Sequence, residues 1–179
     1  MGDDKINTPL HPVQLSDYYI AESEVTNELW KTVTGGLPYD TIPRYNGHTE
    51  HLSMQVPVTA ISWNDVNQLF LPQINAKTGK NFRIPTEAEW EYAAMGGNKC
   101  QGYRFSGSNE LVQVGWNLEL SGGLKQDVMD KKPNELGLYD MSGNAAEWCG
   151  DWYEKNYTFS GVLTNPTGPA TEPQLRRTM

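Results

Sequence analysis

The stretch on which the fold depends is Gly137-Leu-Tyr-Asp-Met-Ser-Gly-Asn-Ala-Ala-Glu-Trp-Cys-Gly-Asp-Trp-Tyr153. It gathers three acids, three glycines and four large aromatic residues. Asp140 and Glu147 lie seven positions apart, with Ser142-Gly143-Asn144 between them. A tight turn, which glycine permits by accepting positive φ, would bring two carboxylates and several backbone carbonyls round one point. Because hard cations such as calcium prefer oxygen ligands of this kind, the stretch predicts a cation site.

Length and charge limit the class of protein. At 179 residues and 20.1 kDa, the chain has the size of one domain, and we expect a single domain over residues 1–179. The 14 basic and 22 acidic residues give a net charge of -8, and no cluster of Lys or Arg could neutralise phosphates. We therefore expect no nucleic-acid partner. No apolar run has the length of a transmembrane segment, and no signal-peptide pattern follows Met1.

Capping residues and apolar spacing predict the helices. Three are expected, over Asn27–Val33, after Ser62, and from Thr86 to Gly96-Gly97. Thr26 and Ser62 are suitable N-cap residues, and Thr86 with Glu89 forms a capping box. Pro72 removes a backbone donor and is expected to split or kink the second helix near Leu71.

Short strands and loops are expected elsewhere. The strand candidates are 13–20, 56–61, 81–84, 103–105, 112–116 and 138–139. We expect a long surface loop over 37–55 and a poorly ordered tail after Tyr157. His48 and His51 in that loop would bind a metal only on a helix, and two solvated histidines are the simpler interpretation.

The two cysteines, Cys100 and Cys149, leave two interpretations open. They form one disulfide, or they are two small core residues. The second interpretation is favoured, because free cysteine is among the most buried residue types in proteins. Enzyme motifs are scarce: the sequence has no dinucleotide-binding or phosphate-binding glycine loop and no Gly-x-Ser-x-Gly element. A carboxylate pair for glycoside cleavage stays open, because separation along the chain does not fix distance.

Several motifs resemble those of one family. In order, they are Tyr18-Tyr-Ile, Glu24-Val-Thr-Asn, Val58-Thr-Ala-Ile-Ser-Trp-Asn-Asp65, Phe82-Arg-Ile-Pro-Thr-Glu-Ala-Glu-Trp-Glu-Tyr-Ala-Ala94, Pro133-Asn-Glu-Leu-Gly-Leu-Tyr-Asp-Met-Ser-Gly-Asn144 and Glu147-Trp-Cys-Gly-Asp-Trp-Tyr153. The chain thus resembles the formylglycine-generating enzyme family, also called the sulfatase-modifying factor family, from about Val13 to Pro169. This resemblance implies an irregular α+β domain of the C-type-lectin-like kind, with two main helices, short antiparallel strands and many loops.

The resemblance also implies a structural calcium ion. By position, its ligands would be the side chains of Glu24, Asp140 and Glu147 and the carbonyl oxygens of Gly143 and Ala145. A second family calcium site would fall near Asn117-Leu118. The segment there is short and different, so we do not expect that second site. At position 146, Ala stands where family members commonly carry Trp.

Catalysis is where the sequence departs from the family. Family enzymes oxidise a sulfatase cysteine to formylglycine, using molecular oxygen and copper held by two cysteines near the C-terminus. Beyond Ala170 the sequence leaves the family pattern, and neither Cys100 nor Cys149 stands at a catalytic position. We therefore assign no catalytic residue, and we expect a domain shortened at both ends that lacks its C-terminal strands. Copper would be a cofactor only with a further C-terminal segment, since a soft copper ion needs thiolate ligands.

Three functions follow from the resemblance. The first is a non-catalytic, calcium-stabilised domain with a binding or structural role, whose partner is an unspecified protein or small ligand. The alternative is a formylglycine-generating oxidase, or a relative that uses iron to form sulfur–carbon bonds. The third is the variable, ligand-binding class of proteins built on this fold. An incomplete sheet edge would favour self-association, and an extracytoplasmic or cell-surface location is favoured.

Overall fold

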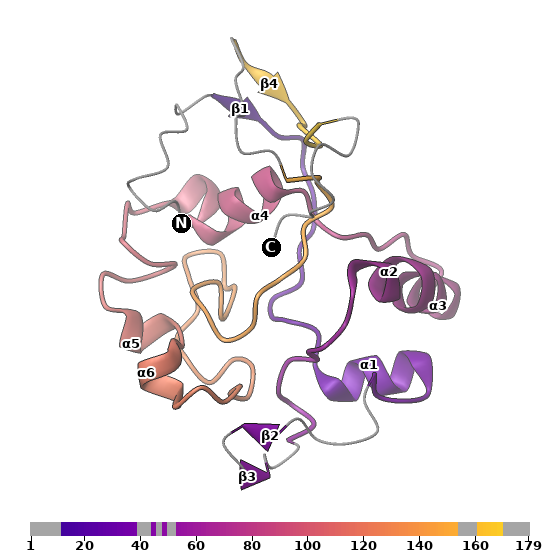
Figure 1. Ribbon diagram of the computed structural model, residues 1–179. Helices are drawn as coiled ribbons and strands as arrows, with labels where there is room; N and C mark the ends of the chain where they lie inside the picture. Colours follow the sequence, from indigo (N-terminus) through magenta and orange to yellow (C-terminus); the bar gives the residue numbers. More distant parts are fainter. Residues whose placement is uncertain (1–11, 39–43, 46–47, 50–52, 154–160, 170–179) are drawn as a thin grey trace.

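Short helices and very short strands make up the regular structure in a computed structural model of the chain (Figure 1). It describes residues 12–38, 44–45, 48–49, 53–153 and 161–169. The helices are α1 (Asn27–Thr34), α2 (Trp63–Asp65), the π-helical η1 (Val66–Phe70), α3 (Leu71–Thr78), α4 (Glu87–Ala94), the 3-10 turn η2 (Gly97–Lys99), α5 (Leu111–Val114) and α6 (Leu118–Ser121). The strands are β1 (Val13–Gln14), β2 (Arg44–Tyr45), β3 (His48–Thr49) and β4 (Leu163–Thr164). The fold is therefore of the α+β class.

The helices begin where the capping residues predict. Thr26 accepts a hydrogen bond from the Leu29 N–H, and Ser62 forms a capping box with Asp65. Pro72 lies in the first turn of α3, directly after the π-helical turn. The predicted interruption near Leu71 is confirmed, because the wider π turn brings the chain past a proline that cannot donate.

α4 confirms the second capping box. The Glu89 N–H donates to the Thr86 hydroxyl at 3.2 Å, and the Thr86 N–H donates to the Glu89 carboxylate at 2.8 Å. The helix ends at Ala94, just before Gly96, which has a φ of 88°. α1 and α4 each have eight residues, and α2, η1 and α3 follow one another without a break from Trp63 to Thr78.

The described residues form two pairs of strands, where the sequence predicts a larger set. β2 and β3 are antiparallel, whereas β1 and β4 are parallel, with Val13 opposite Leu163. The β2–β3 pair agrees with the short antiparallel strands that the resemblance implies, and the parallel β1–β4 pair was not expected. The prediction of a poorly ordered tail after Tyr157 was wrong at β4, because its backbone bonds to the N-terminal segment. Residues 154–160 and 170–179 lie outside the described residues.

Five predicted strands are absent from the described structure: 56–61, 81–84, 103–105, 112–116 and 138–139. At 103–105 only an isolated bridge joins Phe105 and Ser108, and 138–139 belongs to no strand. The other three have a local reason. At 56–61 only an isolated bridge joins Thr26 and Pro57, and a proline cannot extend a ladder because it lacks an N–H. At 81–84 the Asn75 side chain takes both backbone hydrogen bonds of Phe82, which a strand partner would otherwise receive. At 112–116 the first three residues belong to helix α5. The alternation of apolar residues there, which is typical of a strand, was therefore misleading.

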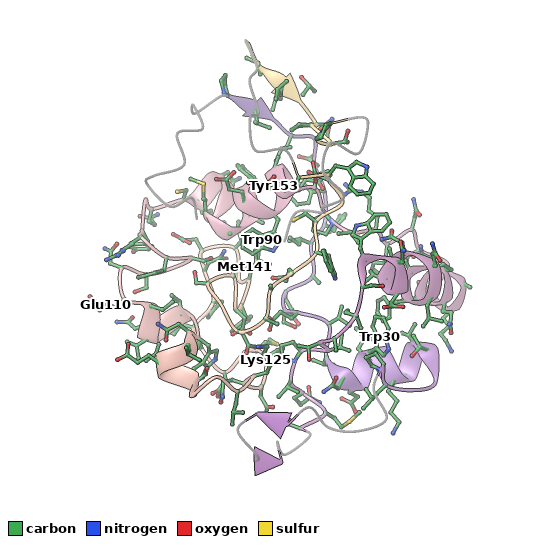
Figure 2. The ribbon with its side chains drawn as sticks, viewed as in Figure 1. Trp30, Trp90, Glu110, Lys125, Met141 and Tyr153 are labelled. Atoms are coloured by element: carbon green, nitrogen blue, oxygen red, sulfur yellow. The ribbon has the colours of Figure 1, made fainter. Side chains whose placement is uncertain are left out.

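Two groups of apolar side chains form the interior. Trp30 stacks on Phe70, with ring centroids 5.0 Å apart, and packs with Val33 and Val58 between α1 and α3. Ala93, Leu138 and Met141 form the second group, beside Trp90. Figure 1 shows the chain from 137 to 153 passing through the middle of the molecule, and Figure 2 places Trp90 and Met141 there. The described residues include no helix with the length and apolar character needed to cross a membrane.

Candidate cation site

The loop from Asp140 to Glu147 contains three sharp backbone turns. Asp140 has a φ of 57°, Gly143 of 126° and Asn144 of 64°. A Cβ atom at Gly143 would overlap the carbonyl of Trp116, to which the Asn144 N–H donates at 3.1 Å. Glycine is therefore required at position 143 both for its positive φ and for the close approach of a neighbouring backbone.

Glu24 comes from the turn before α1 and inserts into this loop. Its side chain is 8% exposed. One carboxylate oxygen accepts a hydrogen bond from the Asn144 amide at 2.8 Å, and the other accepts from the Ala145 N–H at 2.8 Å. The structure thus brings Glu24 to the loop, more than a hundred residues along the chain, as the resemblance implies. The Ala145 N–H bonds to Glu24, whereas the predicted calcium ligand at this position is the Ala145 carbonyl oxygen.

Asp140 is the most deeply buried acid of the loop, with 2% of its surface exposed. Its Oδ2 atom accepts a hydrogen bond from the Met129 N–H at 2.8 Å. Its Oδ1 atom is buried and has no hydrogen-bond partner among the described residues. A buried carboxylate oxygen without a donor is costly, and a bound cation is one way to remove that cost.

The acids of the loop affect one another electrostatically. Burial raises the pKa of Glu24 to about 8; the Ala145 and Asn144 hydrogen bonds oppose this shift, and the charges of Glu147 and Asp140 add to it. Burial also raises the pKa of Asp140 and of Glu147, and the Asp140 charge contributes at Glu147. Within the described part of the chain, no Lys or Arg forms a salt bridge with any of the three.

The predicted ligands are only partly assembled. Glu24 lies at the loop, but its oxygens are occupied by N–H donors. In the described ranges, no group of three or more His, Cys, Asp or Glu side chains is arranged to hold a metal ion. The donor chemistry, carboxylates with nearby carbonyls, suits calcium, and Asp140 Oδ1 is available to it. The structure therefore offers one carboxylate oxygen without a hydrogen-bond partner among the described residues, Oδ1 of Asp140. The second acid, Glu24, would have to give up a hydrogen bond to bind an ion.

Asn144 is a loop residue whose side-chain hydrogen bonds were not predicted from the sequence. Besides its bond to Glu24, its amide accepts from the Gln126 N–H at 2.9 Å and donates to the Gln126 carbonyl at 3.1 Å. The signal was present, since Asn tolerates positive φ and carries both donors and an acceptor. What it bonds to could not be predicted, because Gln126 is distant in sequence.

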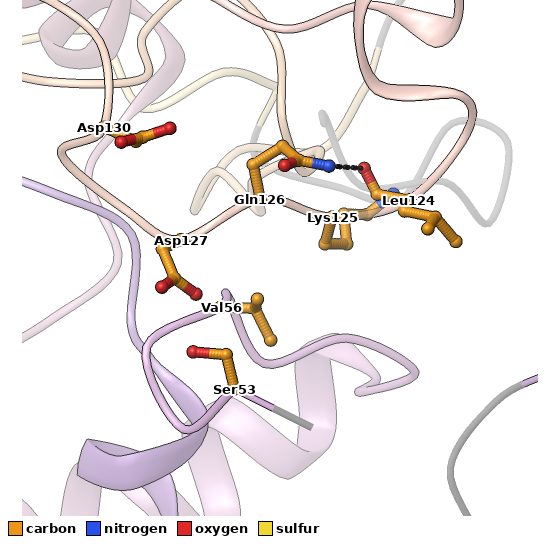
Figure 3. Close-up of a pocket in the computed structure, with 7 residues that line it drawn as sticks. All are labelled: Ser53, Val56, Leu124, Lys125, Gln126, Asp127 and Asp130. Carbon is orange, nitrogen blue, oxygen red and sulfur yellow. Dashed lines mark hydrogen bonds between the residues drawn. The ribbon is translucent and has the colours of Figure 1, made fainter. Parts of the chain in front are cut away.

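Segment 124–130 lies against the loop and also borders a hollow of about 330 Å³ (Figure 3). Ser53 and Val56 form the facing wall, and Lys125, Asp127 and Asp130 supply the charges. Figure 3 shows the Gln126 amide donating to the carbonyl of Leu124, at 3.2 Å. The Asp130 charge contributes to the raised pKa of Asp140, so the hollow and the loop share an electrostatic environment.

The cysteines are free. Cys100 is exposed and Cys149 is buried, so the disulfide interpretation was wrong and the interpretation as core residues holds for Cys149 alone. Burial, and then the charges of Glu87, Asp151 and Glu147, raise the pKa of the Cys149 thiol to about 12. His48 lies in β3 and not on a helix, and His51 lies outside the described residues.

Comparisons with known proteins agree with this structure. The Sulfatase-modifying factor enzyme 1-like domain model matches residues 1–176. The chaperone protein LppX of Paenibacillus barcinonensis is 32% identical over 180 residues, covering 79% of this chain and 64% of that protein. The formylglycine-generating enzyme of Streptomyces coelicolor is 36% identical over 129 residues, covering 64% of this chain and 38% of the enzyme.

A solved structure is similar over nearly the whole chain. Treponema denticola variable protein 1 superposes with a TM-score of 0.79 at 32% identity, covering 96% of this chain and 75% of that one. The chain spans less than two thirds of the length of the curated relatives named above. On the match of the family model and on these similarities, the chain belongs to the formylglycine-generating enzyme, or sulfatase-modifying factor, family.

Proposed function

We propose that the chain is a non-catalytic, calcium-stabilised domain of this family with a binding or structural role, built on a C-type-lectin-like form of the α+β fold. The observation that carries the proposal is the Oδ1 atom of Asp140, which is buried without a hydrogen-bond partner among the described residues. Two further acids are coupled to this residue: the Asp140 charge contributes to the raised pKa of Glu24 and of Glu147, and the Glu147 charge contributes to that of Glu24.

Calcium would be held by the side chains of Glu24, Asp140 and Glu147 and by the carbonyls of Gly143 and Ala145. The ion would supply positive charge to a group of buried carboxylates that no described Lys or Arg neutralises. Glu24 would keep its position at the loop. One of its carboxylate oxygens would give up its hydrogen bond from Asn144 or Ala145 and face the ion. Calcium would then connect the turn before α1 to residues 137–153, the central segment, in addition to the hydrogen bonds that already do so.

The cysteines of this chain support a non-catalytic role. Copper in the family enzymes is held by two thiolates, and a soft ion has no good substitute for sulfur here. Cys149 is buried with a pKa of about 12, so it stays a thiol at neutral pH. Cys100 is exposed, and the two residues form no disulfide. Copper belongs to this function only if a further segment supplies the two cysteines.

The binding role is supported by the kinds of relatives. One relative is named a chaperone and another a variable protein, and both names describe those proteins. They show that members similar to this chain along most of its length carry names other than that of the oxidase. The formylglycine-generating oxidase remains the alternative, because the Streptomyces enzyme shares 36% identity over 129 residues.

The calcium proposal is tested by thermal unfolding of the full chain in calcium and in chelator. Calcium should raise the melting temperature of the wild type by several degrees. Asp140→Asn should remove that response, because the amide keeps an oxygen for Met129 and places nitrogen at the open position. Glu119→Gln, which changes an exposed acid outside the loop, is the matched control. A wild-type melting temperature that is the same in calcium and chelator contradicts the calcium site.

The non-catalytic proposal is tested separately. The full chain is incubated with copper, oxygen and a peptide that contains Cys-x-Pro-x-Arg, and the product is searched for an aldehyde by mass spectrometry and hydrazide labelling. We expect unmodified peptide. Formation of formylglycine would support the oxidase alternative and overturn the non-catalytic half of the proposal.

A further inference from the structure

A second hollow, of about 430 Å³, lies at the end of the molecule where β1 and β4 run side by side (Figure 1). Because the two strands are parallel, their carboxyl ends point the same way and the chain leaves both of them at one edge. The segments that follow, 16–18 and 165–167, form two walls of the hollow, and the residues that lead into α4 form the third.

The walls are fixed by a reciprocal pair of hydrogen bonds. The Ser16 N–H donates to the side-chain oxygen of Asn165 at 2.8 Å, and the Asn165 amide donates to the Ser16 hydroxyl at 2.9 Å. Asn165 holds a φ of 46°, which turns the chain directly after β4. Two walls of the hollow, from the two ends of the described chain, are therefore joined by side-chain hydrogen bonds.

Arg83 lies in this hollow with an unused edge. A guanidinium has five N–H donors. Nη1 donates to the Glu89 carboxylate at 2.7 Å and to the Ile84 carbonyl at 3.2 Å, and Nη2 donates to the other Glu89 oxygen at 2.6 Å. The Nε–H and the second Nη2–H, which share one edge of the planar group, have no partner among the described residues. The Arg83 side chain is 57% exposed, whereas that of Glu89 is 11% exposed.

Glu89 thus fixes the orientation of the Arg83 guanidinium at the wall of the hollow and leaves one donor edge unbonded. Its carboxylate also accepts the Thr86 N–H, so the pair is attached to the first turn of α4 and cannot rotate freely. Such an edge is a fork of two N–H donors that matches the two oxygens of a carboxylate, with two parallel hydrogen bonds.

Apolar surface lies beside the fork. Tyr18, Ile84 and Pro166 line the hollow. The Tyr18 hydroxyl donates to the Glu89 carbonyl at 2.6 Å, which fixes the ring, and burial raises the pKa of Tyr18 to about 12, so the hydroxyl stays protonated. A ligand that suits these walls carries an apolar body next to its charged group.

We propose that this hollow binds an organic carboxylate with an apolar body, held by the free edge of Arg83 and packed against Tyr18, Ile84 and Pro166. A free fatty or aromatic acid and the C-terminal carboxylate of a peptide share this chemistry. Asp17, the other acid on the wall, repels the bound anion and keeps its affinity modest. The site does not use the cation loop and is independent of calcium.

The test is a titration of the full chain with hexanoate, with N-acetyl-leucine as a mimic of a peptide C-terminus, and with N-acetyl-leucinamide as the control without a carboxylate. Binding is followed by the amide resonances of Ser16 and Thr167 and by calorimetry. We expect both acids to bind and the amide to bind at least about tenfold more weakly. Tighter binding of hexanoate would indicate a free organic acid as the ligand, and tighter binding of N-acetyl-leucine would indicate a peptide C-terminus.

Two variants make the test specific to the proposed contact. Arg83→Lys keeps a positive charge beside Glu89 and removes the fork, so it should weaken carboxylate binding by about tenfold while the melting temperature shows a folded protein. Asp17→Asn should tighten binding by about two- to threefold at low salt, because a like charge is removed. Equal binding of the amide, unchanged affinity in Arg83→Lys, or no shift at Ser16 and Thr167 would each overturn the proposal.

Discussion

At the scale of single residues, Asn134 uses the full capacity of its side-chain amide. It is 6% exposed. Its nitrogen donates to the Ala93 carbonyl at 2.9 Å and to the Ser106 hydroxyl at 3.0 Å, and its oxygen accepts from the N–H groups of Leu136 and Leu138 at 2.9 and 3.1 Å. One side chain thereby joins the end of α4 to the start of the central segment.

We predict that Asn134→Ala lowers the free energy of unfolding by about 3 kcal/mol, because it leaves several buried backbone groups without partners. Urea denaturation measures the change. Asn98→Ala, at an exposed position on η2, is the control and should stay within about 0.5 kcal/mol of the wild type. A loss at Asn134 no larger than at Asn98 would mean that water satisfies these groups.

Gly143 is a second residue that we expect to be essential to the fold, because there is no room for a Cβ atom at its position. A side chain there would adopt a φ of 126° and overlap the Trp116 carbonyl. We predict that Gly143→Ala costs more than about 2 kcal/mol of stability. Gly36→Ala is the control, since a Cβ there meets nothing within 4 Å and no positive φ is involved. Similar melting temperatures for the two variants would show that the loop rearranges at little cost.

At the scale of elements, the helices follow from local sequence and most strands do not. The caps at Thr26, Ser62 and Thr86 bond to residues three positions away, so the sequence contains both partners. Strand 81–84 was predicted from its composition, but the Asn75 side chain takes the hydrogen bonds of Phe82. Which group satisfies an extended backbone is a tertiary question.

The start of α4 carries a pH-dependent contact. Hydrogen bonds from Arg83, then from Thr86, hold the pKa of Glu89 below its usual value, against the opposing effect of burial. A lowered folded pKa means that the carboxylate stabilises the fold above the unfolded pKa, near 4.5, and that this contribution is lost as the pH falls through the lower folded value.

We therefore predict that Glu89→Gln is destabilising near neutral pH and that its difference from the wild type shrinks between about pH 5 and about pH 3. Urea denaturation across this range measures it. Glu91→Gln changes an exposed acid on the same helix and is the control, for which we expect a small difference. A constant difference for Glu89→Gln across the range would show that the Arg83 contact does not set the pKa.

At the scale of the whole molecule, contacts between distant segments hold the described residues together with little β-sheet. β1 pairs with β4, and Glu24 bonds to Asn144 and Ala145 across 120 and 121 positions. These contacts hold the helices and the central segment together, with only two-residue strands to assist them.

We predict that Glu24→Ala destabilises the chain by about 1 to 3 kcal/mol in chelator near pH 5, where the raised pKa of about 8 keeps Glu24 neutral in the fold. The substitution removes both oxygens that accept from Asn144 and Ala145 and leaves these two N–H donors unpaired. Chemical denaturation without calcium measures this effect separately from ion binding. Glu91→Ala, at an exposed position, serves as the control. Wild-type stability for Glu24→Ala in chelator would mean that the two hydrogen bonds do not connect these distant segments.

The sequence by itself determined the helix starts, the interruption at Pro72, the α+β class and, through its ordered motifs, the family. Each of these depends on residues that are near one another in the chain or on a pattern read along it. The tertiary structure alone decided that the two cysteines stay apart, that β4 pairs with β1 in parallel, and that Asp140 keeps a buried oxygen without a partner among the described residues. These features depend on which distant segments meet, and the distances between them are set only when the chain packs.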